Sequence, residues 1–99
     1  MQISKFFEEA ANEVELSAEE RKTYAKLVNL YLWTVKKKHE LNEIPADEFD
    51  KRDETGQALE KFETDQLKII AIASKRELEA FQIFLQKCMR SASLSQSPG

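Results

Sequence analysis

The ten residues from Lys26 to Val35, KLVNLYLWTV, constrain the fold more than any other stretch, because seven of them are large and apolar. An ordinary surface helix carries one apolar stripe, whereas this segment is apolar around most of its circumference. The pattern predicts a central helix that other elements cover on more than one side. One face, at three- and four-residue spacing, is formed by Tyr24, Leu27, Val28, Tyr31 and Val35.

The boundaries of this central helix are marked by local signals. Ser17 and Glu20 have the spacing of a capping box, in which each side chain satisfies a backbone N–H of the other residue. At the far end, residues 36–39 are cationic, which suits the negative end of the helix dipole. Asn42 is a candidate for a left-handed cap, and Pro45 disfavours helical geometry at Ile44. The sequence therefore predicts a helix from Ala18 to about Leu41.

A short amphipathic helix is predicted before it, from about Ser4 to Glu15, with Ser4 as its N-cap. Its apolar stripe is Ile3, Phe6, Phe7, Ala10, Ala11 and Val14. Only Leu16 and Ser17 separate the two helices, so we expect a sharp turn between them. The segment 46–56 is polar apart from Phe49 and contains Gly56, so a helix and an acidic loop both remain open there.

From Gln57 to about Arg90 the chain contains no glycine or proline and keeps helical periodicity. Such a helix would be ~50 Å long, against ~36 Å for the central one. Ser74 and Glu77 could form a second capping box that breaks it, or Ser74 could be a serine inside one continuous helix. We expect the second alternative, in which Ser74→Ala costs nothing while Ser17→Ala costs about 1 kcal/mol.

These elements predict an all-α fold, a small antiparallel bundle of three to four helices with a short N-terminal helix and two long ones. Two glycines and two prolines in 99 residues are too few for the turns of an all-β domain. A hydrophobic content of 41% is too high for a disordered chain. We expect one domain over residues 1–90 and a flexible, serine-rich tail over residues 91–99.

Charge is distributed in blocks, although the net charge is only -3. Residues 21–38 contain six basic and no acidic residues, whereas residues 43–65 contain nine acidic and three basic ones. Two interpretations are consistent with these blocks of charge: acidic helices that pack beside a basic one, or solvated faces that simply differ in charge. The excess of acidic over basic residues argues against a dedicated nucleic-acid binder. The basic segment 21–38 nevertheless leaves nucleic-acid association open as an alternative function.

Candidate catalytic groups are few. His39, the only histidine, could join Glu43 and Asp47 in a small metal or acid/base site, but a structural role at the helix end explains it better. Cys88 is the only cysteine, which excludes an internal disulfide and favours a buried structural thiol. We expect no enzyme activity, cofactor or metal.

Surplus apolar helix surface predicts a protein–protein interaction module, of adaptor, inhibitor or assembly-chaperone type. Its partner would be another protein or a second copy, giving a dimer or higher oligomer. The candidate interface residues are Leu30, Trp33, Ile72, Ile83 and Phe84. If the Trp33 ring is buried, Trp33→Ala should cost on the order of 3 kcal/mol. No apolar run could span a bilayer and no signal peptide is visible, so we expect a cytoplasmic protein with no membrane partner.

Overall fold

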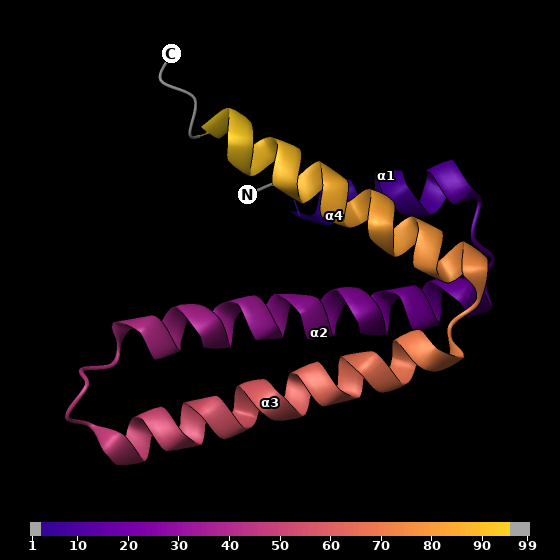
Figure 1. Ribbon diagram of the computed structural model, residues 1–99. Coiled ribbons are helices and arrows are strands. Elements are labelled where there is room, and N and C mark those ends of the chain that lie inside the picture. Colours follow the sequence, from indigo (N-terminus) through magenta and orange to yellow (C-terminus); the bar gives the residue numbers. More distant parts are fainter. Residues whose placement is uncertain (1–2, 96–99) are drawn as a thin grey trace. The chain divides into compact units, whose positions relative to one another are not determined.

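The computed structural model describes residues 3–95, which form four α-helices and no strand (Figure 1). The helices are α1 (Ile3–Val14), α2 (Ala18–Glu43), α3 (Phe49–Ile72) and α4 (Lys75–Ser95). The predicted all-α helical bundle is confirmed. Segment 46–56 is a turn followed by helix, because α3 begins at Phe49. None of the helices described between residues 3 and 95 is long and apolar enough to cross a membrane.

The chain divides into two compact units. Unit 1 contains residues 1–25 and 73–99, hence α1, the first turns of α2, and α4. Unit 2 contains residues 26–72, hence the rest of α2 and all of α3. The prediction of one domain over residues 1–90 stays a prediction.

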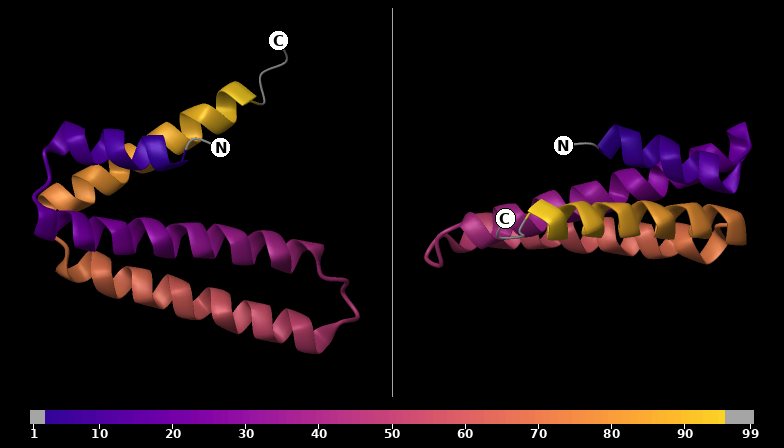
Figure 2. Two further views of the ribbon diagram at one scale, coloured as in Figure 1. Left: turned by 180° about the vertical axis from the view of Figure 1, so that it is seen from behind. Right: turned by 90° about the horizontal axis from the view of Figure 1, so that it is seen from above.

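In unit 1, α1 packs against α4 (Figure 2). The stripe of α1 supplies Ala10 and Ala11, both fully buried. Tyr24 is also fully buried, its ring stacked on that of Phe7 at a centroid distance of 4.6 Å, and its hydroxyl donates to the Phe7 carbonyl. Burial raises the pKa of Tyr24. The buried apolar residues of this unit are Ala10, Ala11, Leu16, Tyr24, Ala80, Phe81 and Phe84.

The turn between α1 and α2 is a Schellman motif. The N–H of Leu16 donates to the Ala11 carbonyl, and the N–H of Glu15 donates to the Asn12 carbonyl, both at 3.1 Å. Glu15 takes the left-handed conformation, with φ of 55°, and Leu16 is buried behind it. The short predicted linker therefore gives the expected sharp turn. The structure starts α1 at Ile3, so Ser4 lies in the first turn and the prediction of Ser4 as N-cap is wrong.

The single long helix expected after Gln57 is wrong, because the chain breaks at Ala73 and Ser74. The N–H of Ser74 donates to Glu77 Oε1 at 2.7 Å, and the N–H of Glu77 donates to Ser74 Oγ at 3.1 Å. This is the reciprocal capping box, and it starts α4. Ser74 is thus a helix cap rather than an interior serine.

The C-terminal boundary also differs from the expectation. α4 continues through Ser95, so the first part of the predicted tail, residues 91–95, is helical. The rest of that tail, residues 96–99, lies outside the described residues.

Unit 2 is a helical hairpin. From Lys26 onward, α2 runs antiparallel to α3 (Figure 1). The Trp33 and Phe62 rings stack at 5.9 Å between centroids. Arg52 in the first turn of α3 donates to the carbonyls of Leu41 and Ile44 at the end of α2, at 3.3 and 3.1 Å. These donors satisfy the last carbonyls of α2. Glu15 is the only non-glycine residue with positive φ in the described chain, so the prediction of a left-handed Asn42 is wrong.

Candidate interaction surface

The core is unevenly divided between the two units. In unit 2 the buried residues are Leu27, Val28 and Thr34, all in the first third of the hairpin. The helix α3 has no buried residue in its whole length of 24 residues. Its apolar side chains facing α2, such as Leu59 and Phe62, are only half-buried. A two-helix hairpin cannot enclose its own apolar side chains, because each helix has one neighbour.

Several large apolar side chains of unit 2 are strongly exposed. The exposed fraction is 47% for Trp33, 67% for Leu67 and 81% for Ile72. The complete set in this unit is Trp33, Val35, Phe49, Leu67 and Ile72. Single exposed apolar residues are ordinary, but five on two adjacent helices with almost no core are more than the hairpin covers by itself.

The condition of a buried Trp33 ring is not met, because 47% of the residue is exposed. One face of its ring stacks on Phe62, and Lys36 Nζ lies 5.0 Å from its centroid, a cation–π distance. Because almost half of the Trp33 surface is exposed, the loss of about 3 kcal/mol in unfolding free energy expected for a buried ring does not apply to Trp33→Ala. A partly exposed tryptophan held rigid by a neighbouring ring has the properties of an interface anchor.

The other predicted interface residues differ in exposure and lie in different units. Ile72 is exposed at the end of α3, and Leu30 is half-buried in the hairpin. Ile83 is half-buried on α4, and Phe84 is fully buried in unit 1, which removes Phe84 from any free surface. Ile72 does not share a helix with Ile83 and Phe84, because α3 ends at Ile72 and the capping box at Ser74 starts α4.

The histidine site predicted as an alternative is sparse. His39 Nε2 lies 3.1 Å from Glu43 Oε1, with both side chains mostly exposed. Asp47 instead borders a shallow hollow in the α2–α3 turn together with residues 48–51. Within residues 3–95, no three side chains of His, Cys, Asp or Glu are grouped so that they could hold a metal ion. Cys88 is half-buried on α4, and burial raises the pKa of its thiol.

The basic segment 21–38 is partly neutralised by its own neighbours. Arg21 pairs with Glu8 at 3.0 Å, Lys22 with Glu19 at 3.3 Å, and Lys37 with Glu40 at 3.1 Å. Lys26, Lys36 and Lys38 make no ion pair with any described residue. Three separated lysines around one tryptophan fall short of the continuous positive groove that single-stranded nucleic acids need.

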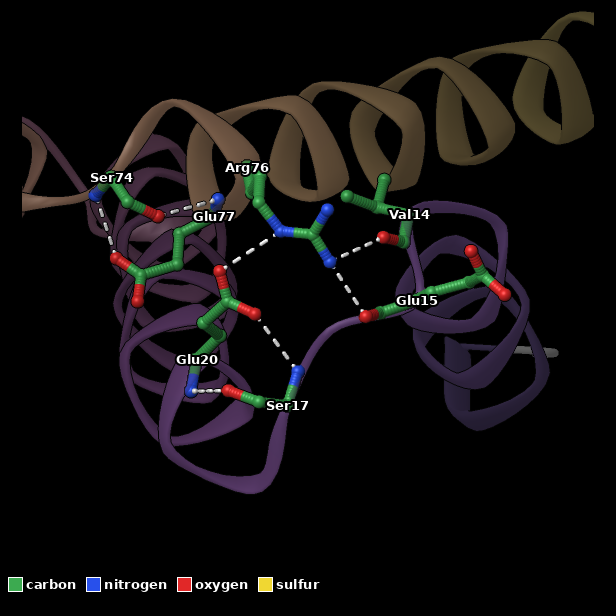
Figure 3. Close-up of polar contacts among 7 residues, drawn as sticks. All are labelled: Val14, Glu15, Ser17, Glu20, Ser74, Arg76 and Glu77. Carbon is green, nitrogen blue, oxygen red and sulfur yellow. Dashed lines mark hydrogen bonds and ion pairs between the residues drawn. The ribbon is translucent and has the colours of Figure 1, made fainter.

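A polar cluster that the sequence analysis missed joins three helix ends in unit 1 (Figure 3). Arg76, in the first turn of α4, donates to the carbonyls of Val14 and Glu15 at 2.8 and 2.6 Å. Its Nε also donates to Glu20 Oε2 at 3.1 Å. The other oxygen of Glu20 accepts the N–H of Ser17 at 2.9 Å. Arg76 therefore links the end of α1 to the start of α2, a long-range role that no local sequence signal announces.

The electrostatics of this cluster favour a structural role. The backbone N–H of Ser17 lowers the pKa of Glu20, and Arg76 lowers it further. On the other side of unit 1, Lys87 of α4 pairs with Glu9 and Glu13 of α1 at 3.2 and 3.3 Å, and the bond to Glu9 raises the pKa of Lys87. Each charged group here is engaged with a partner from its own unit. The exposed large apolar side chains lie on the hairpin instead, with the exception of Met89 on α4.

Comparison with protein-family models, with curated proteins and with solved structures finds no match to this chain.

Proposed function

We propose that the chain is a non-enzymatic protein–protein interaction module that binds through the exposed faces of the α2–α3 hairpin. The observation that carries this proposal is the absence of any buried residue in α3, a helix of 24 residues. Isolated helices gain little stability from propensity alone, so a helix of this kind gains most from a partner that covers its apolar side chains. Adaptor, inhibitor and assembly chaperone are the types of role that such a module fills.

The exposed side chains also have the composition of a binding surface. Trp33 supplies a large rigid ring, and Leu67 and Ile72 supply aliphatic area on α3. Aromatic anchors surrounded by aliphatic and charged side chains are typical of interfaces.

A photo-crosslinking residue placed at Leu67 tests the proposal in the native host. Leu67 is exposed on α3, and its neighbour Lys68 is also exposed but points about 100° further round the helix. We expect crosslinked products heavier than one chain from position 67 and far less from position 68. Equal yields at the two positions, or no product at either, would contradict the proposal.

A further inference from the structure

One face of α2 in unit 2 combines exposed lysines with Trp33. Lys26, Asn29, Trp33 and Lys36 are spaced by three, four and three residues, which puts them on one side of the helix. All four are exposed. Lys26 and Lys36 make no ion pair with any residue in the described range 3–95. We call these four residues the basic face.

One face of α3 has the opposite charge. Asp53, Gly56, Glu60 and Glu63 follow the same three, four and three spacing, and Leu67 continues it at four. The three carboxylates are exposed and make no ion pair with residues that the structure describes. We call Asp53, Gly56, Glu60 and Glu63 the acidic face.

Gly56, in the middle of the acidic face, has no side chain beyond hydrogen. A Cβ built on Gly56 meets no atom within 4 Å, so no part of its own unit requires a glycine there. A glycine inside an exposed helix costs about 1 kcal/mol relative to alanine. Its φ is not positive, so backbone conformation does not explain it either. Close approach of a large side chain from outside the chain would explain it.

We propose that the basic face of one copy of this chain packs antiparallel on the acidic face of a second copy, with Trp33 over Gly56. This names the partner of the proposed interaction module and rests on that function. The register follows from the shared spacing. When Trp33 is opposite Gly56, Lys36 is opposite Asp53, Lys26 is opposite Glu63, and Asn29 is opposite Glu60.

The two faces cannot satisfy each other within one chain. Trp33 stacks on Phe62, which is on a different side of α3 from Gly56 and Glu63. A second copy therefore supplies the complement that the chain itself cannot. Each copy carries both faces, so it offers two surfaces through which a second copy can bind. Opposite charges would meet in either direction along these faces, so the match of Trp33 with Gly56 is what selects the antiparallel direction. The charges themselves disfavour pairing of like faces.

Charge reversal tests the register directly, with matched controls on the same helices. Lys36→Glu and Asp53→Lys each place like charges opposite one another in the contact. Lys38→Glu and Glu54→Lys make the same changes in net charge at exposed positions outside the two faces. Sedimentation equilibrium of the full chain measures the association constant of each variant, and far-UV circular dichroism checks that the helices persist.

We expect wild-type association at micromolar concentration, weakened on the order of tenfold by Lys36→Glu or Asp53→Lys and little changed by the controls. The double variant, with both reversals in one chain, should recover most of the lost association, because the opposite charges meet again. Added salt should weaken the wild type.

Three results would overturn the proposal: a wild type that stays monomeric throughout, controls that act as strongly as the face variants, or a double variant that is not rescued. A monomeric wild type that still gives crosslinks to other proteins from Leu67 would overturn only this inference. Absence of both self-association and crosslinks would overturn the proposed function as well.

Discussion

At the scale of single residues, the turn after α1 depends on a glutamate in a conformation that glycine adopts more readily. Glu15 has φ of 55°, and its carbonyl accepts a hydrogen bond from Arg76. The left-handed region brings Cβ of an L-residue close to the following carbonyl oxygen. The side chain of Glu15 makes no ion pair or hydrogen bond with a described residue that would compensate. The Schellman motif thus contains local strain.

We expect Glu15→Gly to raise the free energy of unfolding by about 0.5–1 kcal/mol, the relief of strain less the higher entropy of glycine in the unfolded chain. Urea denaturation of the two proteins measures the difference. Glu13→Gly, inside α1 and two residues earlier, should destabilise instead, because a helix interior disfavours glycine and the variant also loses the ion pair with Lys87. A destabilising Glu15→Gly would show that the Glu15 side chain contributes something the structure does not contain.

The lowered pKa of Glu20 predicts that the stability of the fold decreases in acid. Its folded pKa is held below its ordinary value of 4.5 by the Ser17 N–H and by Arg76. The ionised form is therefore favoured in the folded state. The stabilisation is present above pH 4.5 and is lost as the pH falls through the folded pKa. Glu20→Gln should destabilise the protein at neutral pH, and the difference from wild type should shrink in acid. Urea denaturation over a pH series measures this, and a difference unchanged into strong acid would exclude the mechanism.

At the scale of elements, two capping boxes of the same type start α2 and α4. In both, a serine and a glutamate three residues later exchange bonds between side chains and backbone N–H groups. Ser17→Ala and Ser74→Ala should each lower the free energy of unfolding by about 1 kcal/mol. Thr64→Ala, at an exposed position inside α3, is the control and should not destabilise. Chemical denaturation of the three variants measures these changes. A neutral Ser74→Ala would restore the single long helix that the sequence suggested.

Gly56 gives a prediction with opposite effects on the single chain and on its association. Alanine fits at Gly56 without meeting any atom, so Gly56→Ala should raise the stability of the separated chain by about 1 kcal/mol. If Trp33 of a second copy sits over Gly56, the added methyl group should weaken association. Denaturation at low concentration and sedimentation at high concentration separate the two effects. Stronger association by the alanine variant would count against the proposed register.

At the scale of the whole molecule, the buried residues are concentrated in unit 1, while α3 has none. Local opening costs least where few apolar contacts must break. Amides of α3 should therefore exchange with deuterium faster than those of α4 around Ala80–Phe84. Hydrogen exchange followed by mass spectrometry measures this at low protein concentration. If self-association occurs through the hairpin, protection of α2 and α3 should rise with concentration while α4 changes little.

Two results of the exchange experiment would contradict these expectations. Slower exchange in α3 than in α4 at low concentration would mean that the hairpin is stable without a partner. Protection that rises with concentration in α4 alone would move the contact away from the hairpin.

The sequence by itself determined the helices whose limits depend on local physics. The capping box at Ser17 starts α2 where predicted, and the two-residue linker makes a sharp turn, because these features involve neighbours in the chain. It also determined the segregation of charge, with six bases and no acid in residues 21–38. The residues of the basic face and of the acidic face can likewise be assigned from the sequence, because each set follows helical spacing.

Only the tertiary structure decided where the long apolar segments break and which of their faces are covered. Helical periodicity continues across residue 74 although α3 ends at Ile72 and α4 begins at Lys75, because both sides are helical and the spacing of apolar residues does not show where one helix stops. Phe84 is buried and Trp33 is half-exposed although both lie in apolar stretches, because burial depends on neighbours distant in the sequence. Arg76 joins three helix ends for the same reason: its partners lie about sixty residues away, and no local pattern encodes that distance.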